Sequence, residues 1–422
     1  MRGSCIITTV KAKTLVCEDC GSSPVPHKLQ YLSVGIESVL SPTIALSQAA
    51  SGAILPFFDA FWDNVLPSTF KILSALHLGK IHTAPTDEDF KWVIELLWKE
   101  ADRRKIKMWQ FLPFGRIKQV FVAEFEGKKI VFERMPVPRG KGRGIWWIDD
   151  KAVLKKHLMK KGFPVARGKS VATKGAALRL FHSLTKPVIV KPSKGSGTRH
   201  TVLHITDEAE LLRAFSVAKA VSPFVVIEEE LKGAVYRPTL VGGKLIATIQ
   251  RNQPMVLGDG VHTIEQLVAE ENKHPRRKGP VFAPITITET VEKELTRQGY
   301  TRLSVPKKDE PVFMHQKVNW GNGGTTEDVT DRAHPDNVKM FEEIAKLVEA
   351  PIVGIDFIIE DISRSWKESP GCGVIECNSM PFIDTHHLPF EGEARDIMGP
   401  IWDAVFPNSK KHTLPALSHE DI

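Results

Sequence analysis

The stretch GVIECN (373–378) places a carboxylate and a carboxamide two positions apart in an apolar segment that is typical of a buried strand. Side chains at positions i and i+2 of a strand point to the same face, so we expect Glu376 and Asn378 to project together. A buried charge without a partner is costly, so this pair requires either a cation or a buried arginine or lysine. Asp356, in the apolar segment GIDFII (354–359), offers a third oxygen ligand. Three hard oxygens from adjacent strands suit Mg²⁺, which completes its octahedron with water and phosphate.

A basic loop that contains glycine lies upstream of these carboxylates. Lys191 ends the β-branched segment KPVIVKP (186–192) and is followed by a flexible stretch that ends in KGSGTRH. Glycines let the backbone approach an anion closely, and hydroxyl and N–H groups can donate to phosphate. The residues that we expect to do so are Ser193, Gly195, Ser196 and Gly197. An ordinary hairpin with a solvated lysine is the alternative. The nearby GFPVARGKS is not a Walker loop, because its first glycine is misplaced by one residue.

Acidic and basic side chains follow on the next predicted strands. The segment FVVIEEEL (224–231) puts Glu228 and Glu229 at a strand end, an edge at which backbone groups often hold adenine and side chains reach its amino group or the ribose. An exposed acidic turn is the simpler explanation. Arg237 and Arg251 lie on otherwise apolar strands. Arginines on a half-buried sheet face usually pair with a planar anion, which is either a protein carboxylate or a ligand phosphate.

The charge of the chain favours anionic partners. The 422 residues carry a formal charge of +7, which fits phosphorylated nucleotides and acidic substrates as well as nucleic acid. The basic residues are scattered in short groups such as 103–105 and 276–278, so we expect no nucleic-acid partner. Trp146 and Trp147 beside the basic loop 139–144 are the one local hint of such a surface. Packing between domains explains these tryptophans better.

Membrane insertion and metal binding by cysteine are not expected. The best candidate for a membrane span, residues 44–62, is interrupted by polar residues and reads as a buried helical segment. Cys17 and Cys20 form a CxxC, but no second CxxC and no HxxxH completes a zinc set, so we place no metal there. Five cysteines make no disulfide framework in a chain of this length, and there is no basic-then-apolar leader. We therefore expect a cytoplasmic protein.

The periodicity of the apolar residues predicts an α+β fold with mixed strands rather than a strict βαβ alternation. Helices are expected at 87–105, 150–162, 207–221 and 335–350. Strands are expected at 186–192, 224–231, 236–243, 244–251, 352–361 and 373–378. The glycine- and arginine-rich loop 139–144 separates an N-terminal α/β region (1–145) from the better-patterned part (146–407), and a polar tail (408–422) follows. The N-terminal region is a candidate for selecting the substrate.

Taken in chain order, these residues resemble the ATP-grasp superfamily. The similarity is greatest with the ATP-grasp domain of cyanophycin synthetases, and the ATP-grasp part of fused bacterial glutathione synthetases is similar too. It covers residues 146 to 407 and rests on the stretches 250–277, 321–337, 353–381 and 389–397. The resemblance implies two α+β subdomains that clasp ATP, with a lid over about 186–260. It also implies an ATP-dependent carboxylate–amine ligase that forms an amide or peptide bond through an acyl phosphate.

The resemblance assigns roles to the residues above. Lys151 or Lys155 would contact the nucleotide phosphates together with Lys191, and the loop 193–199 would close over them. Glu228 and Glu229 would frame the adenine and ribose, and Arg237 and Arg251 would face the acyl phosphate or substrate. The implied magnesium ligands are Asp356, Glu376 and Asn378. The implied substrate-side residues are Gly323, Gly324, Thr325 and Arg395.

The expected cofactors are ATP and Mg²⁺, with Mn²⁺ as an alternative. The expected substrates are a small-molecule or peptide carboxylate and an amino-acid amine, and association into a homo-oligomer is left open. Val235 stands where relatives often have an acidic ribose contact, and His200 replaces a glycine at the end of the phosphate loop. No second ligase domain is expected, so a complete cyanophycin synthetase is not expected. A glutathione synthetase-like ligase and a non-catalytic module that binds ATP and peptide are the alternatives.

Overall fold

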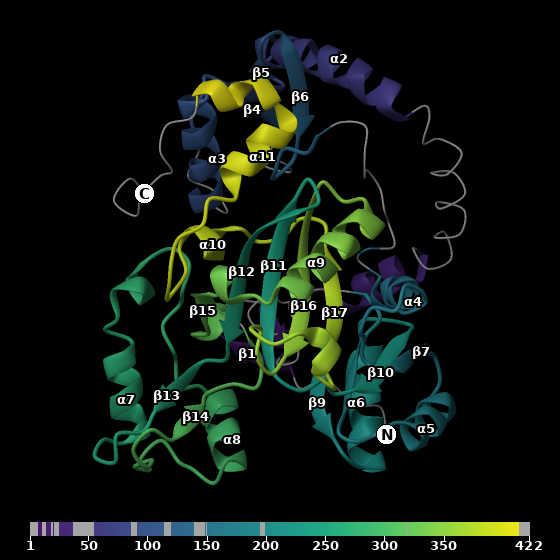
Figure 1. Cartoon of the computed structure of the whole chain (residues 1–422), viewed down its shortest axis with the longest axis vertical. Helices are drawn as coiled ribbons and strands as arrows, with labels where there is room; N and C mark the ends of the chain where they lie inside the picture. The colour runs from purple at the N-terminus through teal and green to yellow at the C-terminus, as the bar shows by residue number, and fades with distance from the viewer. Residues whose placement is uncertain are drawn as a thin grey trace.

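The computed structural model in Figure 1 has an α+β architecture. It describes residues 7–10, 14–17, 20, 25–36, 55–85, 91–113, 120–138, 148, 150–194, 199–318 and 320–412. The paired strands in these residues are antiparallel, where mixed strands were expected. The predicted boundary loop 139–144 and the pair Trp146–Trp147 lie outside the described residues. No helix in the described segments combines the length and apolarity that a membrane crossing needs.

A central sheet of five strands in the order β15-β12-β11-β16-β17 carries most of the candidate site. Its strands are β11 (Ala234–Val241), β12 (Lys244–Asn252), β15 (Thr325–Asp328), β16 (Ile352–Ile359) and β17 (Gly373–Asn378). Helix α9 (Pro335–Val348) begins at a proline and packs its apolar face on this sheet, with Phe341 edge-on against Phe357. One face of the sheet is thereby covered by α9, and Arg237 and Asp356 lie on the other face.

A second sheet, in the order β7-β10-β8-β9, spans residues 168–229 and overlaps the lid expected over about 186–260, whose later part, β11 and β12, belongs instead to the central sheet; this second sheet and its helices are called the lid below. Its strands are β7 (Gly168–Val171), β8 (Val188–Pro192), β9 (Val202–Ile205) and β10 (Val225–Glu229). Helices α5 (Lys174–Ser183) and α6 (Glu208–Lys219) cover it, and Thr173 and Asp207 cap their first turns. Helix α4 (Lys151–Lys160) starts at the cap Asp150, as predicted, and lies beside β17.

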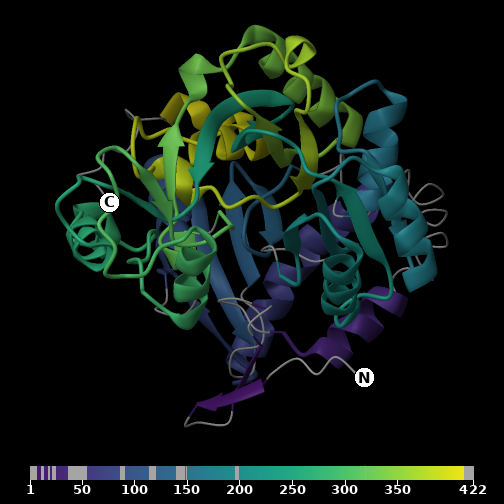
Figure 2. The same cartoon turned by 90° about the horizontal axis from the view of Figure 1, so that it is seen from below.

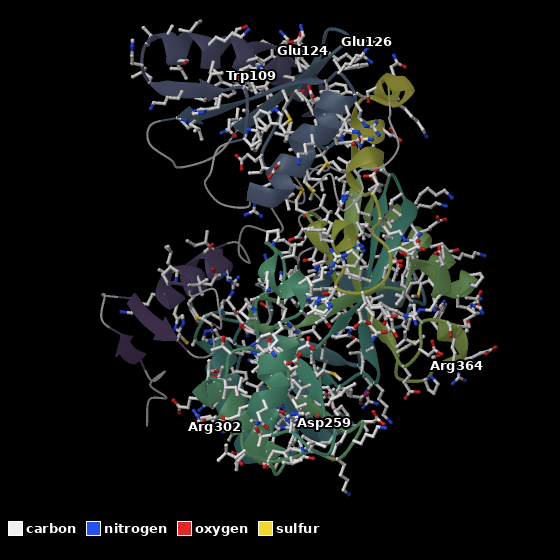
Figure 3. The ribbon with its side chains drawn as sticks, turned by 90° about the vertical axis from the view of Figure 1, so that its left-hand side faces the viewer. Trp109, Glu124, Glu126, Asp259, Arg302 and Arg364 are labelled. Carbon is white, nitrogen blue, oxygen red and sulfur yellow. The ribbon has the colours of Figure 1, made fainter. Side chains whose placement is uncertain are left out.

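A smaller unit extends from the central sheet at the end away from the N-terminal region. It consists of β13 (Met255–Leu257), β14 (Pro311–Phe313), α7 (Ile264–Glu271) and α8 (Glu289–Arg297) around their own apolar cluster. In Figure 3 its residues Asp259 and Arg302 lie at the opposite end of the molecule from Trp109 and Glu124. Short 3-10 helices occur at Pro275–Lys278, Trp320–Asn322, Thr330–Arg332, Trp366–Glu368 and Pro407–His412.

The N-terminal region is built on the antiparallel sheet β3-β4-β5-β6, so the expected α/β arrangement is corrected to α+β. The strands are β3 (Gly79–His82), β4 (Lys107–Pro113), β5 (Val120–Phe125) and β6 (Lys128–Phe132). Helices α2 (Leu55–Ala75) and α3 (Lys91–Arg103) accompany them. The strands β1 (Ile7–Val10) and β2 (Thr14–Cys17) form a separate hairpin, which lies at the lower edge of the molecule in Figure 2.

The C-terminal helix α11 (Met398–Val405) belongs to the core of this N-terminal sheet. Trp402 is fully buried, packs edge-on against Phe132 and donates its indole N–H to the carbonyl of Leu97 at 3.4 Å. The buried Arg104 reaches across to Asp403, with a 2.6 Å hydrogen bond. The region before residue 145 is therefore completed by the far end of the chain, as the yellow helix over α3 shows in Figure 1.

Candidate active site

Two arginines from the central sheet converge on Asp356. The carboxylate of Asp356 is buried on β16, where it accepts 2.5 and 2.7 Å hydrogen bonds from the fork of Arg237 on β11. Arg251 on β12 adds a third bond of 2.9 Å. The pairing of β11 with both β12 and β16 brings these side chains together. The bidentate geometry is what a guanidinium offers a carboxylate. The simpler alternative to a metal cation that was raised for Glu376 and Asn378, a buried arginine partner, therefore applies to Asp356.

The charge in this group is not evenly balanced. Burial opposes the charge on both arginines, but Asp356 outweighs burial for Arg237 and raises its pKa. For Arg251, burial and repulsion by Arg237 lower the pKa to about 10. Its Nε is buried and donates to none of the described residues, and its guanidinium lies 5.2 Å from the ring centre of Trp320. Arg251 therefore retains a donor for a further anion.

Glu376 and Asn378 project together from β17, as the two-residue spacing predicts. The amide of Asn378 donates to Oε1 of Glu376 at 3.2 Å, and β17 pairs with β16 so that Glu376 lies directly opposite Asp356. The ammonium of Lys151 lies 3.5 Å from Oε2 of Glu376. Burial alone would raise the pKa of Glu376, but Lys151 and Arg237 hold it well below its usual range. The carboxylate is therefore ionised and faces the same side as Asp356.

A second charged group lies on the lid. Lys155 on α4 and Lys191 on β8 both donate to the carboxylate of Glu228 on β10, one to each oxygen. Antiparallel pairing sets Lys191 opposite Val226, two positions from Glu228, so the two side chains share a face. Burial opposes ionisation of Glu228, but the two lysines outweigh it and lower its pKa. Burial likewise lowers the pKa of Lys155 more than Glu228 restores it.

Helix α4 joins the two groups. Lys151 and Lys155 are one turn apart and so lie on the same face of the helix, where one contacts Glu376 and the other Glu228. Among the residues described in these groups, five basic side chains face three carboxylates. The excess of positive charge between the central sheet and the lid suits a polyanion such as a nucleotide triphosphate.

The donor set at β16 and β17 fits Mg²⁺. It comprises two carboxylates and a carboxamide that neighbouring strands present on one face, and hard oxygens are the ligands that this ion takes. Both oxygens of Asp356 already accept from arginine. Glu376 and Asn378 are therefore the residues that would hold the ion most directly, with Asp356 beside them.

The other residues expected at the nucleotide lie as follows. Glu229 follows Glu228 on β10, and successive strand residues point to opposite faces. Its carboxylate accepts from the backbone N–H of Thr185 at 2.8 Å. Ser193 is buried, with its hydroxyl 3.1 Å from that of Ser222. Gly195, Ser196 and Gly197 lie outside the described residues. The roles proposed for these residues remain predictions.

The expected substrate-side residues lie on the far edge of the central sheet. Gly323 has a φ of 93°, and a Cβ there would meet Ile285 at 2.5 Å, so both backbone and space require glycine. Gly324 is buried and Thr325 begins β15, opposite Asn252. Arg395 pairs with Asp328 at 2.8 Å, and also with Asp331 and Glu393. The described contacts of Arg395 therefore link the stretch 389–397 to the end of β15.

Two residues near the site, one buried and one half-buried, carried no signal that sequence reasoning used. Lys194, in the predicted phosphate loop, is buried with its ammonium 3.9 Å from the cap residue Asp150. Asp384 begins the short helix α10 (Asp384–His387), and its buried Oδ1 accepts no hydrogen bond from the described residues. Burial raises the pKa of Asp384, although Arg237 acts in the other direction. The position of Lys194 directly after Ser193 could have suggested the first of these, but nothing local marks the second.

Comparison with known proteins identifies relatives of the chain. No protein-family model matches the chain. Over 340 residues the chain is 29% identical to the cyanophycin synthetase of Synechocystis sp., which is 77% of this chain and 37% of that protein. It is 33% identical over 270 residues to the glutathione biosynthesis bifunctional protein of Mannheimia succiniciproducens, which is 62% of this chain and 35% of that protein. The chain thus spans well under half the length of these relatives.

A solved structure has the same fold. The bifunctional glutathione synthetase from Pasteurella multocida superposes with a TM-score of 0.56 and 24% sequence identity, over 75% of this chain and 44% of that one. The antiparallel central sheet and the lid sheet described above agree with the α+β class of this fold. The chain is therefore a protein of the ATP-grasp fold that is similar in sequence to cyanophycin synthetases.

Proposed function

We propose that this protein is an ATP-dependent carboxylate–amine ligase, which forms an amide or peptide bond and releases ADP and phosphate. The observation that carries the proposal is helix α4. It presents Lys151 to the carboxylate pair of the central sheet and Lys155 to the lid. A nucleotide bound between the two would have basic side chains on both sides of its phosphates and oxygen ligands for a cation on one.

Each group has a distinct task in the proposed reaction. Lys155 and Lys191 neutralise the phosphates of ATP. Arg251, whose buried Nε donates to none of the described residues, stabilises the negative charge that moves onto the phosphorylated carboxylate. Mg²⁺ or Mn²⁺ held by Glu376, Asn378 and Asp356 would supply further neutralisation of the phosphate oxygens. Placement and charge neutralisation account for most of the acceleration that such a reaction needs.

The substrates we propose are a small-molecule or peptide carboxylate and an amino-acid amine. The names of two relatives, a cyanophycin synthetase and a glutathione biosynthesis protein, support this proposal. A non-catalytic module that binds ATP and peptide is the second candidate. The pairing of Asp356 with two arginines favours it, because a carboxylate compensated in this way attracts a cation less.

The deciding experiment measures ADP release from the purified chain with ATP and Mg²⁺ across a panel of acid and amine pairs. A ligase releases ADP only when both substrates of a productive pair are present, whereas ATP binding without substrate-dependent turnover would establish the second candidate. With a productive pair, Glu376→Gln should lower kcat/KM by about 1,000-fold, because a ligand of the phosphate-bound cation contributes several kcal/mol to the barrier.

Matched control variants test the assignment of individual residues. Glu360 lies exposed just after β16, and Glu360→Gln should leave kcat/KM within about twofold. Lys191→Ala should abolish turnover, whereas Lys156→Ala, on the exposed face of α4, should not. Equal effects of Glu376→Gln and Glu360→Gln would refute the proposed cation site.

A further inference from the structure

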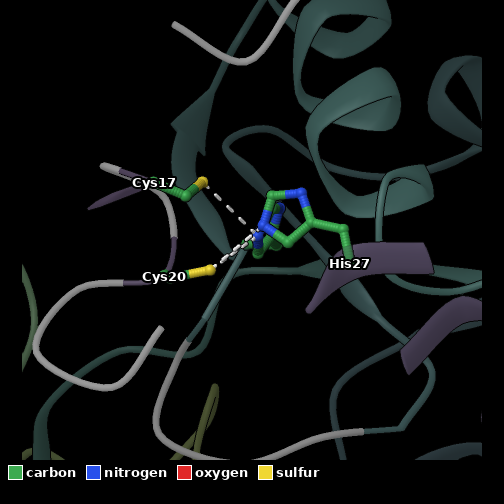
Figure 4. A group of neighbouring side chains, drawn as sticks. Cys17, Cys20 and His27 are labelled. Atoms are coloured by element: carbon green, nitrogen blue, oxygen red, sulfur yellow. Dashed lines mark hydrogen bonds between the residues drawn. The ribbon is translucent and has the colours of Figure 1, made fainter. Parts of the chain in front are cut away.

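Four potential metal ligands converge outside the candidate active site. The sulfur of Cys20 lies 3.2 Å from Nε2 of His27 and 3.4 Å from Nε2 of His200, and the sulfur of Cys17 lies 3.9 Å from the same nitrogen of His200. The four ligand atoms all lie within 4.8 Å of one another, and neither cysteine is in a disulfide. Figure 4 shows Cys17, Cys20 and His27 turned toward one point.

The separations match a tetrahedral zinc site. Zinc bound at about 2.3 Å by sulfur and about 2.0 Å by nitrogen requires sulfur–nitrogen separations of about 3.5 Å along the edges of the tetrahedron. The three measured separations lie within about 0.4 Å of that value. Two thiols and two imidazoles in a closed, mostly buried cluster form the Cys₂His₂ set of structural zinc sites.

The second ring nitrogen of His200 is engaged as in metal-bound histidines. Its Nδ1 lies 2.8 Å from the carbonyl of Val217 on α6, to which it donates, so the lone pair of Nε2 is directed at the cysteines. Such a backbone carbonyl fixes the tautomer and orientation of a ligating imidazole. His27 stands edge-on to His200, with 4.7 Å between ring centres, and presents its own Nε2 to the cluster.

The backbone of His200 is held in a conformation that a histidine adopts at a cost. Its φ is 52°, in the left-handed region that favours glycine. A non-glycine residue there costs on the order of 1 kcal/mol and persists where its surroundings require the side chain. The replacement of the glycine that relatives have at position 200 by histidine is thereby explained. Glycine would suit the backbone but would remove a metal ligand.

We propose that Cys17, Cys20, His27 and His200 bind a structural Zn²⁺ ion. The expectation that no metal lies at the CxxC is thereby revised. That expectation rested on the absence of a second metal-binding motif in the sequence. The two histidines instead come from separate segments of the chain. His27 lies seven residues from Cys20, and His200 lies 180 residues away.

The ion would fasten the N-terminal segment to the lid. Cys17 ends β2, and His27 begins a helix over 27–36, in which Val34 is buried and Gly35 approaches Pro223 of the lid region. His200 lies in the lid, directly after the predicted phosphate loop in sequence. The site thus joins two parts of the chain that are far apart in sequence, and it does not depend on the proposed ligase activity.

The primary test uses the full chain, purified without chelator and supplied with Zn²⁺ alone. We expect about one zinc per chain by elemental analysis. Cobalt substituted for zinc should show the intense visible bands of a tetrahedral site and a thiolate-to-metal band in the near ultraviolet. A chain that takes up no zinc, or a cobalt spectrum without a thiolate band, would overturn the proposal.

Variants locate the ion. Cys20→Ser should weaken zinc affinity by more than about 100-fold in competition with a chromophoric chelator, because it removes a direct ligand. Cys372→Ser, at a buried cysteine elsewhere, should leave the affinity unchanged. His200→Gly suits the backbone and should fold but lose zinc, whereas His200→Cys should retain it. The control His204→Ala, at a second histidine with positive φ, should bind zinc as the parent does. Unchanged affinity in both Cys20→Ser and His200→Gly would refute the assignment.

Discussion

The central sheet and the lid each bury one carboxylate between two cations, but they do so with different chemistry. In the arginine–aspartate group (Arg237, Arg251 and Asp356), planar guanidinium forks grip the carboxylate at two or more points. In the lysine–glutamate group (Lys155, Lys191 and Glu228), each ammonium makes a single contact from a flexible stem. The carboxylates are equally buried, with 3% and 2% of their side chains exposed. The difference therefore lies in the cation. It indicates that the arginine–aspartate group is fixed, whereas the lysines of the lysine–glutamate group can exchange their carboxylate for another anion.

The largest expected effect is at the fixed group. Arg237→Met removes the bidentate partner of Asp356, and breaking a buried ion pair on one side costs about 3–5 kcal/mol. Urea denaturation should show this loss in the free energy of unfolding. The exposed Arg364, labelled in Figure 3, provides the control, and Arg364→Met should change stability by less than about 0.5 kcal/mol. A loss below about 1 kcal/mol for Arg237→Met would show that Asp356 is not held as described.

At the exchangeable group, stability and nucleotide binding should separate. Glu228→Gln leaves two buried lysines without their carboxylate and should cost about 2–4 kcal/mol of unfolding free energy. ATP should nevertheless bind as well as before or more tightly, since phosphates can replace the lost anion. Denaturation and calorimetric titration with ATP measure the two effects. A tenfold loss of ATP affinity without loss of stability would mean that Glu228 contacts the nucleotide directly, and Glu229→Gln is the control.

Mild acid should distinguish the two regions. Burial beside the central sheet lowers the pKa of His386 to about 3 and that of His387 to about 4. Both histidines are therefore neutral in the folded protein at neutral pH. Unfolded histidines protonate below about 6.5, so the unfolded state binds more protons and stability falls as the pH drops from about 6.5 toward 4. Each histidine should cost about 1 kcal/mol by pH 5.5.

The lowered pKa of Glu228 contributes stability that is lost only at lower pH, as the pH falls below 4.5, the ordinary pKa of a glutamate. Denaturation at about pH 7.0, 5.5, 4.5 and 3.5 in the parent and in His386→Gln samples both windows. The variant should show a flatter dependence between pH 6.5 and 4.5, as about one proton fewer is taken up on unfolding. An identical slope in the two proteins would assign the acid sensitivity to other groups.

The smallest effect is expected at Arg395, outside both groups. Its contacts with Asp328, Asp331 and Glu393 are partly exposed, so Arg395→Gln should cost about 1 kcal/mol or less. If Arg395 only links β15 to the last segment, the KM values for the acid and amine substrates should stay within about twofold. A large rise in one KM would instead support the substrate-binding role that the resemblance implies.

Local signals in the sequence predicted the parts that depend on neighbouring residues. The cap at Asp150, the glycine at 162 and the apolar period between them place α4 correctly, and strand alternation puts Glu376 beside Asn378. The same alternation argues that Glu228 and Glu229 point apart, although the resemblance had grouped them. Which cation compensates Asp356 depends on the register of three strands, which no local pattern encodes.

The remaining features depend on contacts between distant segments. The cysteine–histidine cluster joins residues separated by 180 positions, and the hydrogen bond from Trp402 to Leu97 spans 305. Neither histidine of the cluster stands in a metal-binding motif, and α11 carries no mark that assigns it to the N-terminal sheet. Such contacts are fixed by packing, so the sequence supplies the side chains without indicating their partners.

The position of α11 has a consequence for how the chain acquires its structure during translation. Domains are generally completed in the order in which they leave the ribosome. Here Phe132 is synthesised long before Trp402, the ring against which it packs edge-on, so it lacks this partner until α11 emerges. The sheet β3-β4-β5-β6 is thus finished only after the central sheet and the lid have been made, and part of its apolar face stays open to chaperones or to aggregation until α11 is synthesised.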